Sequence, residues 1–92
     1  MTISEFLKLE REKRCLTQAQ MAEKLGVNRA TYNSYEKGWV DKKKNNYLRV
    51  PGLKVRTKIA KLTGCSKEYV NELIENERKE KRWRTLLSKN SN

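Results

Sequence analysis

Histidine is absent from these 92 residues, and proline and phenylalanine occur once each. Without histidine, the commonest general base of enzymes is missing, and the remaining side chains show no paired nucleophile and base. The sequence also lacks a glycine-rich phosphate loop and a cluster of metal ligands. We therefore expect a protein that is not an enzyme and that needs no cofactor.

Long apolar runs are also absent, and apolar residues make up 36% of the chain. A membrane-spanning helix needs about 20 consecutive apolar residues, so no span is expected. The first residues include an acid, Glu5, and no apolar stretch of the signal-peptide kind. We expect a cytoplasmic protein that forms one compact domain with a small core and a large charged surface.

Acidic residues are few beside basic ones. The chain carries 22 lysines and arginines against 11 acids, a formal net charge of +11. Such a field attracts polyanions and speeds their encounter with the protein. Nucleic acid is the first candidate partner, and an anionic membrane surface is the second.

The stretch from Thr17 to Gly38 predicts two short helices joined by a glycine turn. Thr17 and Asn28 can each cap a helix start with a side-chain oxygen. Gly26 can end the first helix in the left-handed conformation. One face of that helix is apolar, formed by Met21, Ala22 and Leu25. Two short helices at such a turn form a helix-turn-helix.

The second of these helices has two different sides. Tyr32 and Tyr35 fall on one side and can pack against the first helix. The opposite side carries groups that can read base edges, namely Arg29 at its margin and then Ala30, Asn33, Ser34 and Lys37. Asparagine can bind adenine through two hydrogen bonds, arginine or lysine can bind guanine, and alanine can contact the thymine methyl. This face is the candidate DNA-reading site.

The same stretch resembles the phage-repressor and Cro family of helix-turn-helix regulators. The matching residues are Leu16-Thr17-Gln18, then Met21 to Val27, and finally Tyr35-Glu36-Lys37-Gly38. The resemblance implies an all-α fold of five compact helices and a recognition helix from Asn28 to Lys37. It also implies that Gln18 touches phosphate or supports a base-reading side chain, and that Arg11 pairs with Glu36.

The two cysteines, Cys15 and Cys65, are not part of the family pattern. Relatives usually have glycine where this chain has Cys15. Cys15 and Cys65 could form a disulfide, but a DNA-binding protein works in a reducing compartment. We interpret them as two small core residues with free thiols, since two thiolates alone cannot fill a zinc shell.

The loop at residues 39–50 is longer than in relatives. Trp39 and Val40 before its tip, with Tyr47, Leu48 and Val50 after it, could pair as two short strands. Two interpretations of the tip remain open at this point. Lys42, Lys43 and Lys44 either contact DNA phosphate or form a solvated charged loop.

Two further helices are expected, one beginning near Pro51 or Gly52 and ending at Gly64, and one capped by Ser66. We assign residues 1–76 to the helix-turn-helix domain and residues 77–92 to a basic tail or helix extension. Glu75 to Arg82 is too polar to bury alone, whereas the end of the tail is apolar at Trp83, Leu86 and Leu87. Three interpretations of the tail remain open: an arm that packs on a second subunit, a basic tail that binds DNA, or a frayed end. We prefer the dimer arm.

Together these features predict a transcriptional regulator that binds a double-stranded, near-palindromic operator as a homodimer. The competing interpretation is an antitoxin, which binds a toxin partner through loop 39–50 or tail 77–92 and also binds its own promoter. A third is an adaptor that has kept the fold and lost DNA binding.

Overall fold

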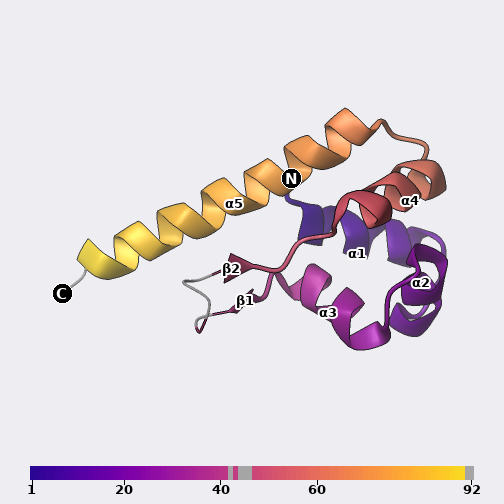
Figure 1. The fold of residues 1–92 in the computed structure, drawn as a ribbon, viewed down its shortest axis with the longest axis horizontal. Helices are drawn as coiled ribbons and strands as arrows, with labels where there is room; N and C mark the ends of the chain where they lie inside the picture. The colour runs from indigo at the N-terminus through magenta and orange to yellow at the C-terminus, as the bar shows by residue number, and fades with distance from the viewer. Residues whose placement is uncertain (42, 44–46, 91–92) are drawn as a thin grey trace.

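The structure is a computed structural model that describes residues 1–41, 43 and 47–90, with residues 41, 47 and 82–90 described by their backbone alone. This described part confirms the predicted all-α class, with five helices and one short strand pair (Figure 1). In chain order the elements are α1 (Ile3–Lys13), α2 (Gln18–Leu25), α3 (Arg29–Lys37), β1 (Val40–Asp41), β2 (Tyr47–Leu48), α4 (Leu53–Thr63) and α5 (Lys67–Asn90).

Side-chain caps fix the starts of the first three helices. Thr2 accepts a hydrogen bond from the backbone nitrogen of Glu5 at the start of α1, and its hydroxyl donates to the Glu5 carboxylate at 3.0 Å. Thr17 forms a reciprocal capping box with Gln20 at the start of α2. Asn28 caps α3 by accepting from the backbone nitrogen of Thr31 at 2.8 Å. Each cap satisfies a backbone donor that the helix itself cannot use.

The turn between α2 and α3 depends on a left-handed residue. Gly26 has φ of +72°, where a Cβ would be strained. The next backbone nitrogen, that of Val27, donates back to the carbonyl of Ala22 at 3.0 Å. This bond closes the end of α2 and allows α3 to start two residues later.

A single core joins the five helices. Tyr32 is fully buried and Tyr35 is 6% exposed, so the inner side of α3 faces the core as the spacing predicts. Around them pack the other buried apolar residues, Ile3, Phe6, Leu7, Met21, Ala22, Leu25, Ile59, Val70, Leu73 and Ile74. The opposite side of α3 is thereby left toward solvent.

The enlarged loop contains the strand pair expected from its sequence. β1 and β2 are antiparallel, with Val40 opposite Leu48 and Asp41 opposite Tyr47. Leu48 is buried, whereas Trp39 is 43% exposed. The pair follows α3 directly, so it lies beside the end of that helix (Figure 1). The next helix begins at Leu53 with Gly52 as its cap, slightly later than Pro51.

Helix α5 continues well beyond the core. Figure 1 shows its C-terminal half projecting past the strand pair and away from the other helices. Within Glu75 to Arg82, the stretch expected to be too polar to bury alone, Glu77 is buried at 3% exposure. Its Oε1 accepts a hydrogen bond from the backbone nitrogen of Ser4 at 3.1 Å, so the carboxylate caps the start of α1. The division of the chain at residue 76 stays a prediction.

The two cysteines are both free thiols, but only part of their predicted placement holds. Cys65 is half-buried and packs against the core. Cys15, by contrast, is exposed and has φ of +57°. This position needs a left-handed backbone between α1 and α2, which explains why glycine would be favoured there. The expectation of a core residue at Cys15 was therefore wrong.

Candidate nucleic-acid interface

The outer side of α3 presents polar and cationic groups. Its cap Asn28 and the residues Arg29, Ala30 and Lys37 are exposed, while Asn33 and Ser34 are half-buried. The side chains of Arg29 and Lys37 form no hydrogen bond or ion pair with the described part of the chain. One cationic side chain at each end of the helix thus remains available to an anionic partner.

Two of the polar groups on α3 are already engaged locally. The Asn28 side-chain oxygen holds the Thr31 backbone nitrogen, so only its amide nitrogen remains as a donor. The Ser34 hydroxyl donates to the carbonyl of Ala30 at 3.0 Å, and it is left with acceptor capacity alone. These bonds limit what each side chain can offer to a base or a phosphate.

Arg11 and Glu36 form the ion pair that the family resemblance implies, and it ties α1 to α3. Arg11 Nε lies 2.7 Å from Glu36 Oε2, and Nη2 lies 3.3 Å from Oε1. The guanidinium also donates to the carbonyl of Leu16 at 3.0 Å. Both side chains are largely buried, at 16% and 5% exposure. A bidentate pair of this kind fixes orientation as well as distance.

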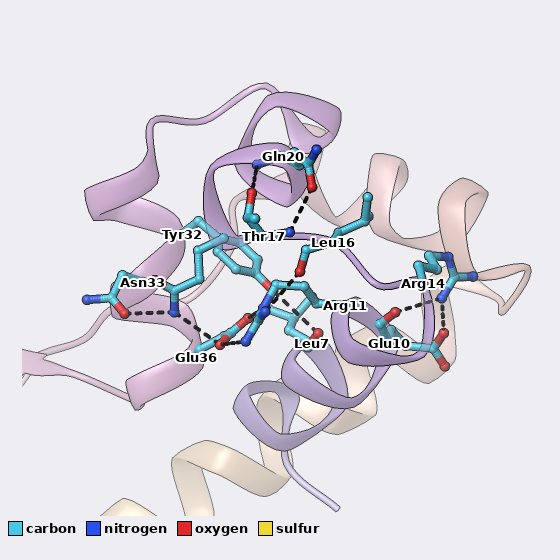
Figure 2. A network of polar contacts seen from close by, with 11 residues as sticks. Leu7, Glu10, Arg11, Arg14, Leu16, Thr17, Gln20, Tyr32, Asn33 and Glu36 are labelled. Atoms are coloured by element: carbon cyan, nitrogen blue, oxygen red, sulfur yellow. Dashed lines mark hydrogen bonds and ion pairs between the residues drawn. The ribbon is translucent and has the colours of Figure 1, made fainter.

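Gln18 extends this pair to the outer side of α3. Its amide nitrogen donates to Glu36 Oε1 at 3.2 Å and to Asn33 Oδ1 at 3.0 Å. Figure 2 shows the resulting chain of contacts from Arg11 through Glu36 to Asn33. Gln18 therefore contacts Asn33 in the structure, and its role on DNA stays a prediction.

Electrostatics keep this network in one protonation state at neutral pH. Burial raises the pKa of the Glu36 carboxyl, but the donor groups of Arg11, Tyr32 and Gln18 together lower it by more, so its pKa lies below the ordinary value. Burial raises the pKa of the neighbouring Tyr32 well above its usual range. The Tyr32 hydroxyl stays protonated and donates to the carbonyl of Leu7 at 3.3 Å.

Arg49, which directly follows β2, is a residue that sequence reasoning missed. The guanidinium carbon of Arg49 lies 5.3 Å from the ring centroid of Trp39, a cation–π contact. The backbone nitrogen of Arg49 also donates to the carbonyl of Trp39 at 3.0 Å. Of the three loop lysines, Lys43 is exposed, and Lys42 and Lys44 lie outside the described residues.

A second missed residue is Lys81 of α5, which lies at the end of α3. A Cβ built on Gly38 would meet Lys81 Nζ at 3.2 Å and Glu77 Oε2 at 3.5 Å. A cation at a helix C-terminus interacts favourably with the helix dipole. Apolar spacing provides no signal for this contact, because Lys81 belongs to a highly charged stretch.

Neither a metal-binding cluster nor a membrane span is found in the described residues. There, no group of three or more histidine, cysteine, aspartate or glutamate side chains is placed to hold a metal ion. Within the same part of the chain, none of the helices combines the length and apolarity needed to span a bilayer.

Comparison with known proteins bears on the segment that contains this interface. A family model described as Helix-turn-helix matches residues 7–44, which include Arg11, Gln18 and all of α3. No curated protein and no solved structure matches the chain. The matched segment, with its capped helices, glycine turn and exposed α3, is a helix-turn-helix of the phage-repressor and Cro type, a type found in DNA-binding transcription regulators.

Proposed function

We propose that this protein is a sequence-specific repressor of the phage or mobile-element kind, which binds a near-palindromic operator as a homodimer. The observation that carries the proposal is the two-sided character of α3. Its tyrosines are buried, and its other side exposes Arg29, Ala30 and Lys37 beside Asn33. A helix anchored in this way can enter the major groove without unfolding any of the core.

The side chains divide into two roles. Arg29, Asn33 and Lys37 read base edges, aided by Ala30 and Ser34. Asn28, Lys42, Lys43 and Lys44 hold phosphate and set the register of the protein on DNA. Gln18 was a further phosphate candidate, but its amide nitrogen already donates to Glu36 and Asn33, so it takes the supporting role. The net charge of +11 supplies attraction that does not depend on sequence.

The homodimer is proposed from α5. This helix continues to Asn90 and projects beyond the core (Figure 1). The projecting part contains Trp83, Leu86 and Leu87, and apolar side chains at such a density are more stable when covered. A second copy of the chain would cover them and would place the two recognition helices about 34 Å apart, one turn of B-DNA.

Selection of bound duplexes from a random DNA pool tests this proposal. The salt concentration must be near physiological, because a strongly basic protein holds any DNA at low ionic strength. A two-fold symmetric enriched motif is the expected result, with half-sites about one helical turn apart. The absence of any enriched motif would overturn the proposal.

The length of α5 also favours a second candidate function, that of an antitoxin. In that case the projecting part of α5, or loop 39–50, binds a toxin protein rather than a second copy. A variant with Trp83, Leu86 and Leu87 all changed to serine separates the two functions. Loss of the dimer in sedimentation, with loss of operator affinity, supports the repressor; an unchanged dimer that still binds its operator supports a separate partner surface.

A further inference from the structure

The orientation of the Asn33 amide decides which bases this side chain can read. An asparagine amide carries an acceptor oxygen and a donor NH2 group, and turning it over exchanges the two. Asparagine commonly binds adenine by using both groups at once. Whether both are available here depends on the contacts that Asn33 makes inside the protein.

The first step fixes Glu36 as an acceptor. Arginine can only donate, and Arg11 donates to both oxygens of Glu36, at 2.7 Å and 3.3 Å. The carboxyl is nearly buried and its pKa is held below the ordinary value, so it is ionised at neutral pH. Every other group that contacts these oxygens must therefore be a donor.

The second step fixes the amide of Gln18. The Gln18 atom that lies 3.2 Å from Glu36 Oε1 is its amide nitrogen. If this amide turned over, its oxygen would face a carboxylate oxygen at hydrogen-bond distance, and two acceptors would repel each other. The Arg11–Glu36 pair therefore holds Gln18 in one orientation.

The third step carries this orientation to Asn33. The same Gln18 nitrogen lies 3.0 Å from Asn33, so the Asn33 atom there must be the acceptor oxygen. Figure 2 shows the Asn33 amide nitrogen on the far side of the group, pointing away from Glu36. The group that Asn33 turns outward is consequently a donor.

We propose that Asn33 presents its amide nitrogen to the major groove and selects a G·C base pair, with Gln18 as the positioning residue. Guanine offers two acceptors there, O6 and N7, which one NH2 group can contact together. Adenine offers one acceptor beside an amino donor, which would face the outward NH2 group of Asn33, and thymine offers the single acceptor O4 beside its methyl group. This inference rests on the proposed function, because it names the base that the proposed reader contacts.

The first test compares motifs selected by the wild-type protein and by Asn33→Ala. The position whose preference disappears in the variant is expected to be a G·C pair, in either orientation. Replacing that guanine by 7-deazaguanine should weaken wild-type binding by about tenfold and should leave binding by Asn33→Ala unchanged. An A·T pair at the position, or no position that depends on Asn33, overturns the inference.

The second test breaks the support with Gln18→Met, which keeps the length of the side chain and removes its donor. The freed Asn33 amide can turn over, so the preference at its position should relax toward A·T while other positions stay the same. Gln20→Met is the matched control, because Gln20 lies on the same helix and contacts Thr17 instead. Its motif should equal that of the wild type.

The outcomes separate this inference from the proposed function. A clear wild-type motif with an unchanged Asn33 position in Gln18→Met contradicts the positioning role alone. A wild-type protein that selects no motif contradicts the proposed function, and the inference falls with it. Thermal unfolding of each variant shows that a changed motif does not come from a misfolded protein.

Discussion

Arg11 and Glu36 connect α1 to α3 through two hydrogen bonds, one of 2.7 Å and one of 3.3 Å. Glu36 is 5% exposed, so removing Arg11 would leave a buried carboxylate without its counter-ion. This pair also starts the chain of contacts that reaches Asn33 through Gln18. In the proposed function, stability and base reading therefore both depend on this pair.

Arg11→Ala is expected to lower the free energy of unfolding by about 3–5 kcal/mol, the usual cost of leaving one charge of a buried pair alone. Urea unfolding followed by circular dichroism measures this. Arg78→Ala is the control, because Arg78 pairs with Glu75 at the surface and such pairs contribute about 0–1 kcal/mol. If Arg11→Ala unfolds at the same urea concentration as the parent, the pair does not hold the helices together.

The stability of the protein should fall in acid because of Glu36. The pKa of its carboxyl lies below the ordinary value in the folded protein, since the donor groups of Arg11, Tyr32 and Gln18 together outweigh the effect of burial. The unfolded chain therefore takes up this proton at higher pH than the folded chain does. The contribution of Glu36 is complete above its unfolded pKa and is lost as pH falls through the lower folded value.

Urea unfolding at a series of pH values, compared with Glu36→Gln, isolates this effect. The wild type should lose stability below about pH 4.5, and Glu36→Gln should lose less over the same interval, although it is weaker at neutral pH. Equal acid slopes for the two proteins would show that another carboxyl is responsible.

Cys15→Gly should stabilise the protein by about 0.5–1 kcal/mol. Cys15 holds φ of +57°, where a Cβ costs about 1–2 kcal/mol, and the greater freedom of glycine in the unfolded chain offsets part of that gain. Cys15→Ala is the matched control, because it removes the thiol and keeps the Cβ. Calorimetry that finds an equal gain for both variants would assign the effect to the thiol rather than to the backbone.

Alanine at Lys42, Lys43 and Lys44 together should weaken DNA binding without changing base preference. Each lysine that no longer neutralises a phosphate should reduce the slope of log affinity against log salt by about 0.9. The charge-matched control removes Lys54, Lys61 and Lys67, which are exposed on α4 and at the start of α5. Fluorescence anisotropy titrations at several salt concentrations measure the slope; an equal slope for both triple variants would mean that the loop does not bind phosphate.

Much of the fold could be predicted from local signals. Thr17, Gly26 and Asn28 act within a few residues of themselves, so their caps and turn can be read from the sequence. The spacing of Tyr32 and Tyr35 likewise predicts the inner side of α3. The pairing of Arg11 with Glu36 is a contact across the chain, and the family resemblance supplied it.

The parts that were missed depend on tertiary contacts. Glu77 lies in a stretch that reads as solvent-exposed, and it is buried because the start of α1 needs an acceptor at that point. Cys15 is apolar in character, but the geometry between α1 and α2 places it at the surface. The link from Gln18 to Asn33 requires the relative placement of two helices, which spacing alone does not give.

The central claim is that the exposed side of α3 reads DNA sequence. The most direct measurement is the ratio of affinities for the selected operator and for random DNA, compared between Arg29→Ala/Lys37→Ala and the charge-matched Lys61→Ala/Lys67→Ala. Both variants lose two positive charges, so both should bind random DNA somewhat less tightly. We predict that the free-energy difference corresponding to this ratio falls by about 1–3 kcal/mol for each base-reading side chain removed from α3. The control should keep the wild-type ratio. An α3 variant that keeps the wild-type ratio would contradict the account and would favour an adaptor that has lost DNA reading.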